Sequence, residues 1–67
     1  MNIFYDDKTD LLYLRLDPRT QEVTNKRVSD ELVIDIGDDQ KIIGIEILNA
    51  SKHIDLESIL PIKYEPV

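Results

Sequence analysis

The sequence contains no cysteine, and this absence limits what can stabilise a chain of 67 residues. A single core of this size rarely contributes more than about 3–5 kcal/mol, so small domains usually add a disulfide, a metal site or a partner subunit. Without cysteine, disulfides and thiolate metal sites are both excluded. We therefore expect the chain to complete its core as a homo-oligomer, most simply a dimer.

Long apolar runs and a basic leader are also absent. No stretch of about 18 apolar residues occurs, which predicts that the chain does not enter a membrane. The amino terminus, Met-Asn-Ile-Phe-Tyr-Asp-Asp, lacks the basic and apolar segments of a secretory signal. Together with the lack of cysteine, these features predict a cytoplasmic protein.

Basic residues are few, because 8 lysines and arginines stand against 14 aspartates and glutamates, for a net charge of -6. This balance repels a phosphate backbone, so we predict no direct nucleic-acid partner. A small basic protein is the partner that the charge favours. The alternative is that the acidity serves only to keep a small protein soluble.

Hydrophobic residues make up 42% of the chain, too many for a disordered protein. Alternating patterns bounded by turn residues predict five strands, over residues 2–6, 11–17, 21–28, 31–37 and 41–48. The third is the most polar, so we place it at a sheet edge, where charge discourages pairing with other chains.

The fifth predicted strand carries apolar side chains on both faces. Ile43, Ile45 and Ile47 share one face, whereas Ile42 and Leu48 lie on the other with Gly44. Both faces of this strand are therefore expected to be at least partly covered. A glycine weakens a strand, so Gly44 predicts the close approach of another backbone or side chain.

After Leu48 the pattern changes to that of short helical turns. Asn49 or Ser51 is expected to cap one turn, and Asp55 to cap a helix over residues 56–60 that Pro61 ends. A helix of two turns is unstable alone and must pack on the sheet. We predict an α+β fold, an antiparallel β-meander of about five strands with one short C-terminal helix.

We predict a single domain over residues 1–60 and an extended tail over residues 61–67. The short helix covers only part of one sheet face, and the opposite face is too apolar to remain fully exposed to water. Its predicted apolar residues are Leu11, Tyr13, Val33, Ile42 and Leu48. We expect a second copy to cover them, sheet against sheet, while Ile62 and Tyr64 provide contacts from the tail.

Two motifs resemble a known family. They are Tyr5-Asp6-x-x-x-Asp10-x-Leu12-Tyr13-Leu14-x-Leu16 and Gly44-Ile45-Glu46-Ile47-Leu48-Asn49-Ala50-Ser51. Together they resemble the small prokaryotic proteins grouped as domain of unknown function 2283, in which Asp usually stands where this chain has Asn49. The resemblance implies an antiparallel meander with a short helix and no known activity. Because such genes often lie beside genes for small toxin-like proteins, it also implies an antitoxin-like, partner-binding role.

Ser51, His53 and Asp55 are the residues to weigh for catalysis. Residues two apart in an extended segment face the same way, so these three side chains are expected on one side of the chain. A serine, a histidine and an aspartate also have the composition of a hydrolytic set. No glycine elbow or oxyanion loop accompanies them, and capping or surface exposure explains them as well. We predict no catalytic residue and no cofactor.

Aspartates in two turns are the residues to weigh for metal binding. Asp6, Asp7 and Asp10 lie in one turn and Asp38 and Asp39 in another, and their oxygens suit calcium or magnesium if the turns meet at one end of the meander. Neither turn has the spacing of a calcium loop, and Asp is favoured in turns for backbone reasons. We therefore predict no metal site.

These patterns together predict a non-enzymatic protein-interaction module, and the resemblance implies an antitoxin-like role for it. The alternative is a small hydrolase or metal-dependent enzyme that uses His53 or the Asp-rich loops.

Overall fold

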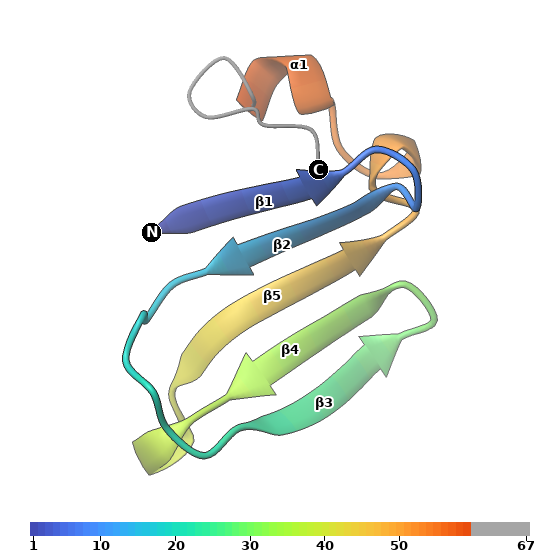
Figure 1. The fold of residues 1–67 in the computed structure, drawn as a ribbon. Coiled ribbons are helices and arrows are strands. Elements are labelled where there is room, and N and C mark those ends of the chain that lie inside the picture. Colours follow the sequence, from blue (N-terminus) through green and yellow to red (C-terminus); the bar gives the residue numbers. More distant parts are fainter. Residues whose placement is uncertain (60–67) are drawn as a thin grey trace.

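A computed structural model describes residues 1–59 and shows a five-stranded antiparallel sheet with one short helix near the end (Figure 1). The predicted α+β architecture is confirmed. The elements are β1 (Asn2–Asp6), β2 (Leu11–Arg15), β3 (Thr24–Ser29), β4 (Leu32–Ile36), the 3-10 turn η1 (Asp38–Gln40), β5 (Ile42–Leu48), the 3-10 turn η2 (Ala50–Lys52) and the helix α1 (Leu56–Ile59).

The strand order across the sheet is β1-β2-β5-β4-β3, so the last strand is the central one (Figure 1). Strand β5 carries apolar side chains on both of its faces. As the central strand, it is also hydrogen-bonded to a neighbouring strand along each of its two edges. Every residue of β3 is exposed, and β3 lies at an edge, as its polarity predicts. It begins at Thr24, later than predicted.

The pairing register sorts the side chains onto two faces. One row runs across all five strands as Phe4, Tyr13, Glu46, Val33 and Arg27. Because side chains alternate along a strand, the neighbouring rows point the other way. The helix-side face therefore carries Ile3, Tyr5, Leu12, Leu14, Leu32, Ile34, Ile45 and Ile47. The register confirms the two parities predicted for β5, and it places Leu11 and Tyr13 of β2 on the same face, as predicted.

The hydrophobic core lies on the helix-side face, at the end where β5 leads into α1. Tyr5, Leu12 and Ala50 are buried there, and Ile54 and Leu56 from the C-terminal segment pack against them. Removal of these apolar side chains from water explains how so short a helix is held in place.

The capping predicted after β5 is confirmed in position only: Asn49 precedes η2, but its side chain forms no capping hydrogen bond. Asn49 has left-handed backbone angles (φ 52°, ψ 46°), whereas a capping residue at the start of a helix needs an extended conformation. Its side chain instead donates to the Glu31 carboxylate. Ser51 lies inside η2, and its hydroxyl donates to Asp10. Asp55 does precede α1, where its carboxylate accepts a hydrogen bond from the Ser58 hydroxyl.

Candidate functional site

The face opposite α1 is the first candidate site, and we call it the uncovered face. Among residues 1–59, no helix lies on it, because Ile54 and Leu56 pack against the other side. The five side chains predicted for this face share it by register and alternation: Leu11, Tyr13, Val33, Ile42 and Leu48. Val33 is buried and Ile42 is 49% exposed, while the other three are half-buried.

Phe4 extends the apolar part of this face, and it was missing from the predicted set. It pairs with Tyr13 across β1 and β2, and the two rings stack with centroids 6.4 Å apart and planes inclined by 25°. Phe4 is 52% exposed. Its parity within β1 was the available signal, because Phe4 alternates with Ile3 and Tyr5.

A polar network crosses the middle of the uncovered face. The Tyr13 hydroxyl donates to Asp35 Oδ2 at 2.9 Å, and the Asn25 amide donates to Asp35 Oδ1 at 2.6 Å. Arg15 donates in turn to the Tyr13 hydroxyl at 3.1 Å. Asp35 is only 5% exposed, so these bonds satisfy a carboxylate that would otherwise be costly to bury. The network holds Tyr13 flat across the sheet.

Gly44 makes this arrangement sterically feasible. A Cβ atom at position 44 would lie 2.5 Å from the Tyr13 hydroxyl and 3.0 Å from Asp35 Oδ2. The close approach that the glycine predicts is therefore confirmed, and the approaching group is the Tyr13 side chain.

Glu46 occupies the centre of the face. Its register neighbours are Tyr13 on β2 and Val33 on β4, and it is half-buried. Within the described part of the chain, the Glu46 carboxylate forms no hydrogen bond or ion pair. It presents an unpaired negative charge between two largely apolar neighbours.

A second candidate site lies at the end of the sheet that contains the β1–β2 turn, the β3–β4 turn and the segment after β5 (Figure 1). The Ala50 amide donates to the Asp10 carbonyl, which joins two of these segments. We call this region the acidic end. It gathers the carboxylates of Asp6, Asp7, Asp10, Asp30, Glu31, Asp55 and Glu57. Its cations are Lys8, Lys52 and Arg27, whose guanidinium donates to the Ser29 and Asp30 carbonyls in the β3–β4 turn.

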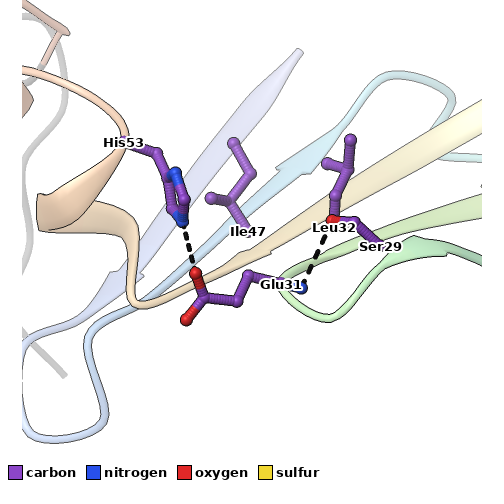
Figure 2. Close-up of a pocket in the computed structure, with 5 residues that line it drawn as sticks. All are labelled: Ser29, Glu31, Leu32, Ile47 and His53. Carbon is purple, nitrogen blue, oxygen red and sulfur yellow. Dashed lines mark hydrogen bonds and ion pairs between the residues drawn. The ribbon is translucent and has the colours of Figure 1, made fainter.

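A hollow of about 260 Å³ opens at the acidic end, lined by Ser29, Glu31, Leu32, Ile47 and His53. Figure 2 shows the imidazole of His53 pointing at Glu31, with Ile47 and Leu32 beside them. His53 Nε2 lies 2.6 Å from Glu31 Oε1. The hydrogen bond from Asn49, and secondly that from His53, lower the pKa of Glu31. The hollow thus combines apolar side chains with an ionised carboxylate.

The family model described as "Protein of unknown function (DUF2283)" matches residues 2–51, which include all five strands. The chain belongs to this family. The family match contains the whole uncovered face, whereas His53 and α1 follow it in the sequence. Searches of curated proteins and of solved structures gave no significant match. Within residues 1–59, no helix is long and apolar enough to cross a membrane.

In this family member, the three residues weighed for catalysis bond to other partners. The Ser51 hydroxyl donates to Asp10 at 2.6 Å, and Asp55 accepts from Ser58 at 2.8 Å. His53 contacts Glu31 rather than either of them. The Ser51 hydroxyl, and secondly that of Tyr5, lower the pKa of Asp10. The structure therefore does not bring Ser51, His53 and Asp55 together as a nucleophile, base and orienting acid.

The two Asp-rich turns lie at opposite ends of the sheet, so the premise that they meet is wrong. The turn with Asp10 joins β1 to β2, and the turn with Asp38 and Asp39 joins β4 to β5. The first turn follows β1 and the second follows β4, and these two strands run in opposite directions in the antiparallel sheet, so the turns lie at opposite ends. Among residues 1–59, no three His, Asp or Glu side chains are grouped to hold a metal ion.

The tail contacts predicted for Ile62 and Tyr64 lie outside the described residues. Of the predicted interface set, the structure therefore places the five sheet residues. It adds Phe4 and Glu46 to them on the same face.

Proposed function

We propose that this chain is a non-enzymatic protein-binding module whose acidic end receives a small basic protein. The observation that carries the proposal is the uneven distribution of charge. Seven carboxylates gather at one end of the sheet against two lysines and the guanidinium of Arg27, around a hollow that has apolar side chains in its lining. A concentration of one sign of charge steers an oppositely charged partner and orients it on arrival.

The hollow supplies both kinds of contact that a protein interface needs. Leu32 and Ile47 are half-buried and offer apolar surface to a side chain from the partner. The Glu31 carboxylate lies beside them, and hydrogen bonds from Asn49 and His53 lower its pKa, which favours its ionised form. A carboxylate accepts charge-assisted hydrogen bonds from an arginine or lysine, even where it already has other donors.

The specific form of this proposal is an antitoxin-like role, in which the chain binds and neutralises a small basic protein. Its support is the acidic end together with the short length of the chain. A basic partner also offsets the repulsion among the clustered carboxylates, so that complex formation relieves an unfavourable arrangement.

Affinity capture from the lysate of the source cells tests the proposal, with two triple variants compared to the wild-type chain. The first variant, Asp7→Asn, Asp30→Asn and Glu57→Gln, removes exposed charges at the acidic end. The matched control, Glu22→Gln, Asp38→Asn and Asp39→Asn, removes three exposed charges elsewhere. Each triple changes the net charge of -6 by the same amount.

We expect the wild type to recover one small basic protein in near-equal amount, and recovery to fall as salt rises. The first triple should reduce recovery and the control should preserve it. Recovery of this chain alone would contradict a hetero-partner. Equal losses in the two triples would show that overall charge, and not the acidic end, drives the capture.

A further inference from the structure

The uncovered face supports a second proposal that does not depend on the acidic end. We propose that it is the interface of a symmetric dimer, in which the uncovered faces of two copies of this chain pack against each other.

Charge separates this face from the rest of the molecule. Its positive residues are Arg15 and, at the border with the acidic end, Arg27, which donates to the Ser29 and Asp30 carbonyls. Its carboxylates are Asp35 and Glu46 within the sheet and Asp6 at the rim. The face thus carries about -1 of the total charge of -6. Two copies of an acidic chain repel least where each is nearly neutral. A basic protein, in contrast, is attracted more strongly to the acidic end.

A symmetric interface places the same surface on both sides, so that surface must complement itself. The uncovered face carries both signs of charge together with apolar side chains, which meets this requirement. Glu46 is the group that most needs a partner, because its half-buried carboxylate is unpaired among residues 1–59. An arginine of the second copy supplies the missing counter-charge, and two-fold symmetry repeats the contact.

The apolar content and size of the face are those of a small interface. Phe4 is 52% exposed and stacks on Tyr13, and aromatic residues are enriched at interface centres. Five strands spaced by ~4.8 Å, each with about five residues rising ~3.4 Å, give a face of about 24 by 17 Å. Two such faces in contact bury roughly 800 Å² of planar area, before the relief of the side chains is added, which is the range of a small, weak interface.

The polar network prepares the face for association. Tyr13 is already held by Asp35, Gly44 and Arg15 in the single chain. An ordered aromatic side chain loses little conformational entropy when it is buried, so less of the association free energy is spent on ordering it.

Sedimentation equilibrium at micromolar concentration tests the dimer with the full chain. We expect twice the chain mass of 7.8 kDa for the wild type. Phe4→Glu places a charge within the proposed interface and should raise the dimer dissociation constant by about tenfold or more. Val23→Glu is the matched control, since Val23 is 41% exposed and lies outside the strands. It should leave the dissociation constant unchanged, and circular dichroism checks that both variants are folded.

The second pair of variants examines the central carboxylate. Glu46→Lys brings a cation against the arginines of the other copy and should also weaken the dimer. Its control, Glu22→Lys, makes the same charge change outside the sheet and should leave the dimer dissociation constant unchanged. A wild-type mass of one chain would overturn the proposal. So would a dimer that Phe4→Glu and Glu46→Lys leave as tight as their controls.

A measurement on the unmodified sequence completes the test. In an equimolar mixture of isotope-labelled and unlabelled chains, we expect nuclear Overhauser effects between the Phe4 or Tyr13 ring of one copy and the uncovered face of the other. Intermolecular effects confined to other surfaces would assign the interface elsewhere and overturn the proposal.

Discussion

Tyr13 and Asp35 are joined by a hydrogen bond of 2.9 Å that crosses β5, the strand lying between theirs. The bond passes over Gly44, where any side chain would collide with the Tyr13 hydroxyl. On the uncovered face, the side chains of β2 and β4 are thus hydrogen-bonded to each other across β5, and the glycine leaves the space for this contact. The arrangement gives several measurable consequences.

Gly44→Ala is expected to destabilise the protein although alanine suits strands no worse than glycine does. The added Cβ would lie 2.5 Å from the Tyr13 hydroxyl and must displace it from Asp35. Overpacking of this kind costs about 1–3 kcal/mol of unfolding free energy. Urea denaturation of the two proteins measures the difference.

The Tyr13→Phe background supplies the control for this prediction. Removing the hydroxyl takes away the atom nearest to the added methyl group, so Gly44→Ala should cost less there than in the wild type. Equal costs in the two backgrounds would mean that the collision does not involve the Tyr13 hydroxyl.

Asp35→Ala is expected to cost about 1–3 kcal/mol, because it leaves the Tyr13 hydroxyl and the Asn25 amide without their acceptor in a buried setting. Asp35→Asn retains one acceptor oxygen and the shape of the side chain, so its effect should be smaller. Thermal unfolding of both variants gives the comparison. If Asn proves as damaging as Ala, the charge rather than the hydrogen-bond geometry is what the site requires.

The acid stability of the protein should depend on Asp10. Its carboxylate accepts hydrogen bonds from the Ser51 hydroxyl and from Tyr5, and these lower its pKa below the ordinary value of 3.8. A group whose pKa is lower in the folded state stabilises the fold above its unfolded pKa. This stabilisation is lost as the pH falls through the folded pKa.

Asp10→Asn is therefore expected to be less stable than the wild type at neutral pH and to lose less further stability below about pH 4. Urea unfolding at several pH values measures both effects. Asp7→Asn is the control, since Asp7 is an exposed neighbour in the same turn. A variant at Asp10 whose acid profile matches the wild type would contradict the role of these hydrogen bonds.

Deletion of residues 62–67 tests the contacts predicted from the sequence for Ile62 and Tyr64. We expect a higher dimer dissociation constant or weaker capture of the partner, because two apolar anchors are removed. Unchanged mass and unchanged capture would remove the tail from the interface. The same two assays as above give the answer.

Much of the fold could be predicted because its signals are local. Asn2–Asp6 is predicted and observed with the same bounds, and the alternation within β2 and β5 gives the correct faces. Gly44 is also interpreted correctly as a point of close approach. The identity of the approaching group could not be predicted, since Tyr13 and Gly44 are neighbours only through the pairing of β2 with β5.

The candidate site is where local signals fail. Ser51, His53 and Asp55 are close in sequence, yet Ser51 bonds to Asp10 and His53 contacts Glu31, residues far away along the chain. Short spacing along the chain is therefore what brought these three residues into consideration, and their hydrogen bonds to distant residues separate them.

The sequence by itself determined five strands, a polar edge strand, two side-chain parities and an acidic chain without disulfides. These follow from residue type and from a period of two, which are properties of neighbouring residues. The position of β5 between β2 and β4, and with it the reach of Tyr13 to Asp35, depends on the tertiary structure. The reason is that the strand order depends on which strands pair after a long connection closes. That choice results from the competition among all possible strand pairings of the chain and not from neighbouring residues.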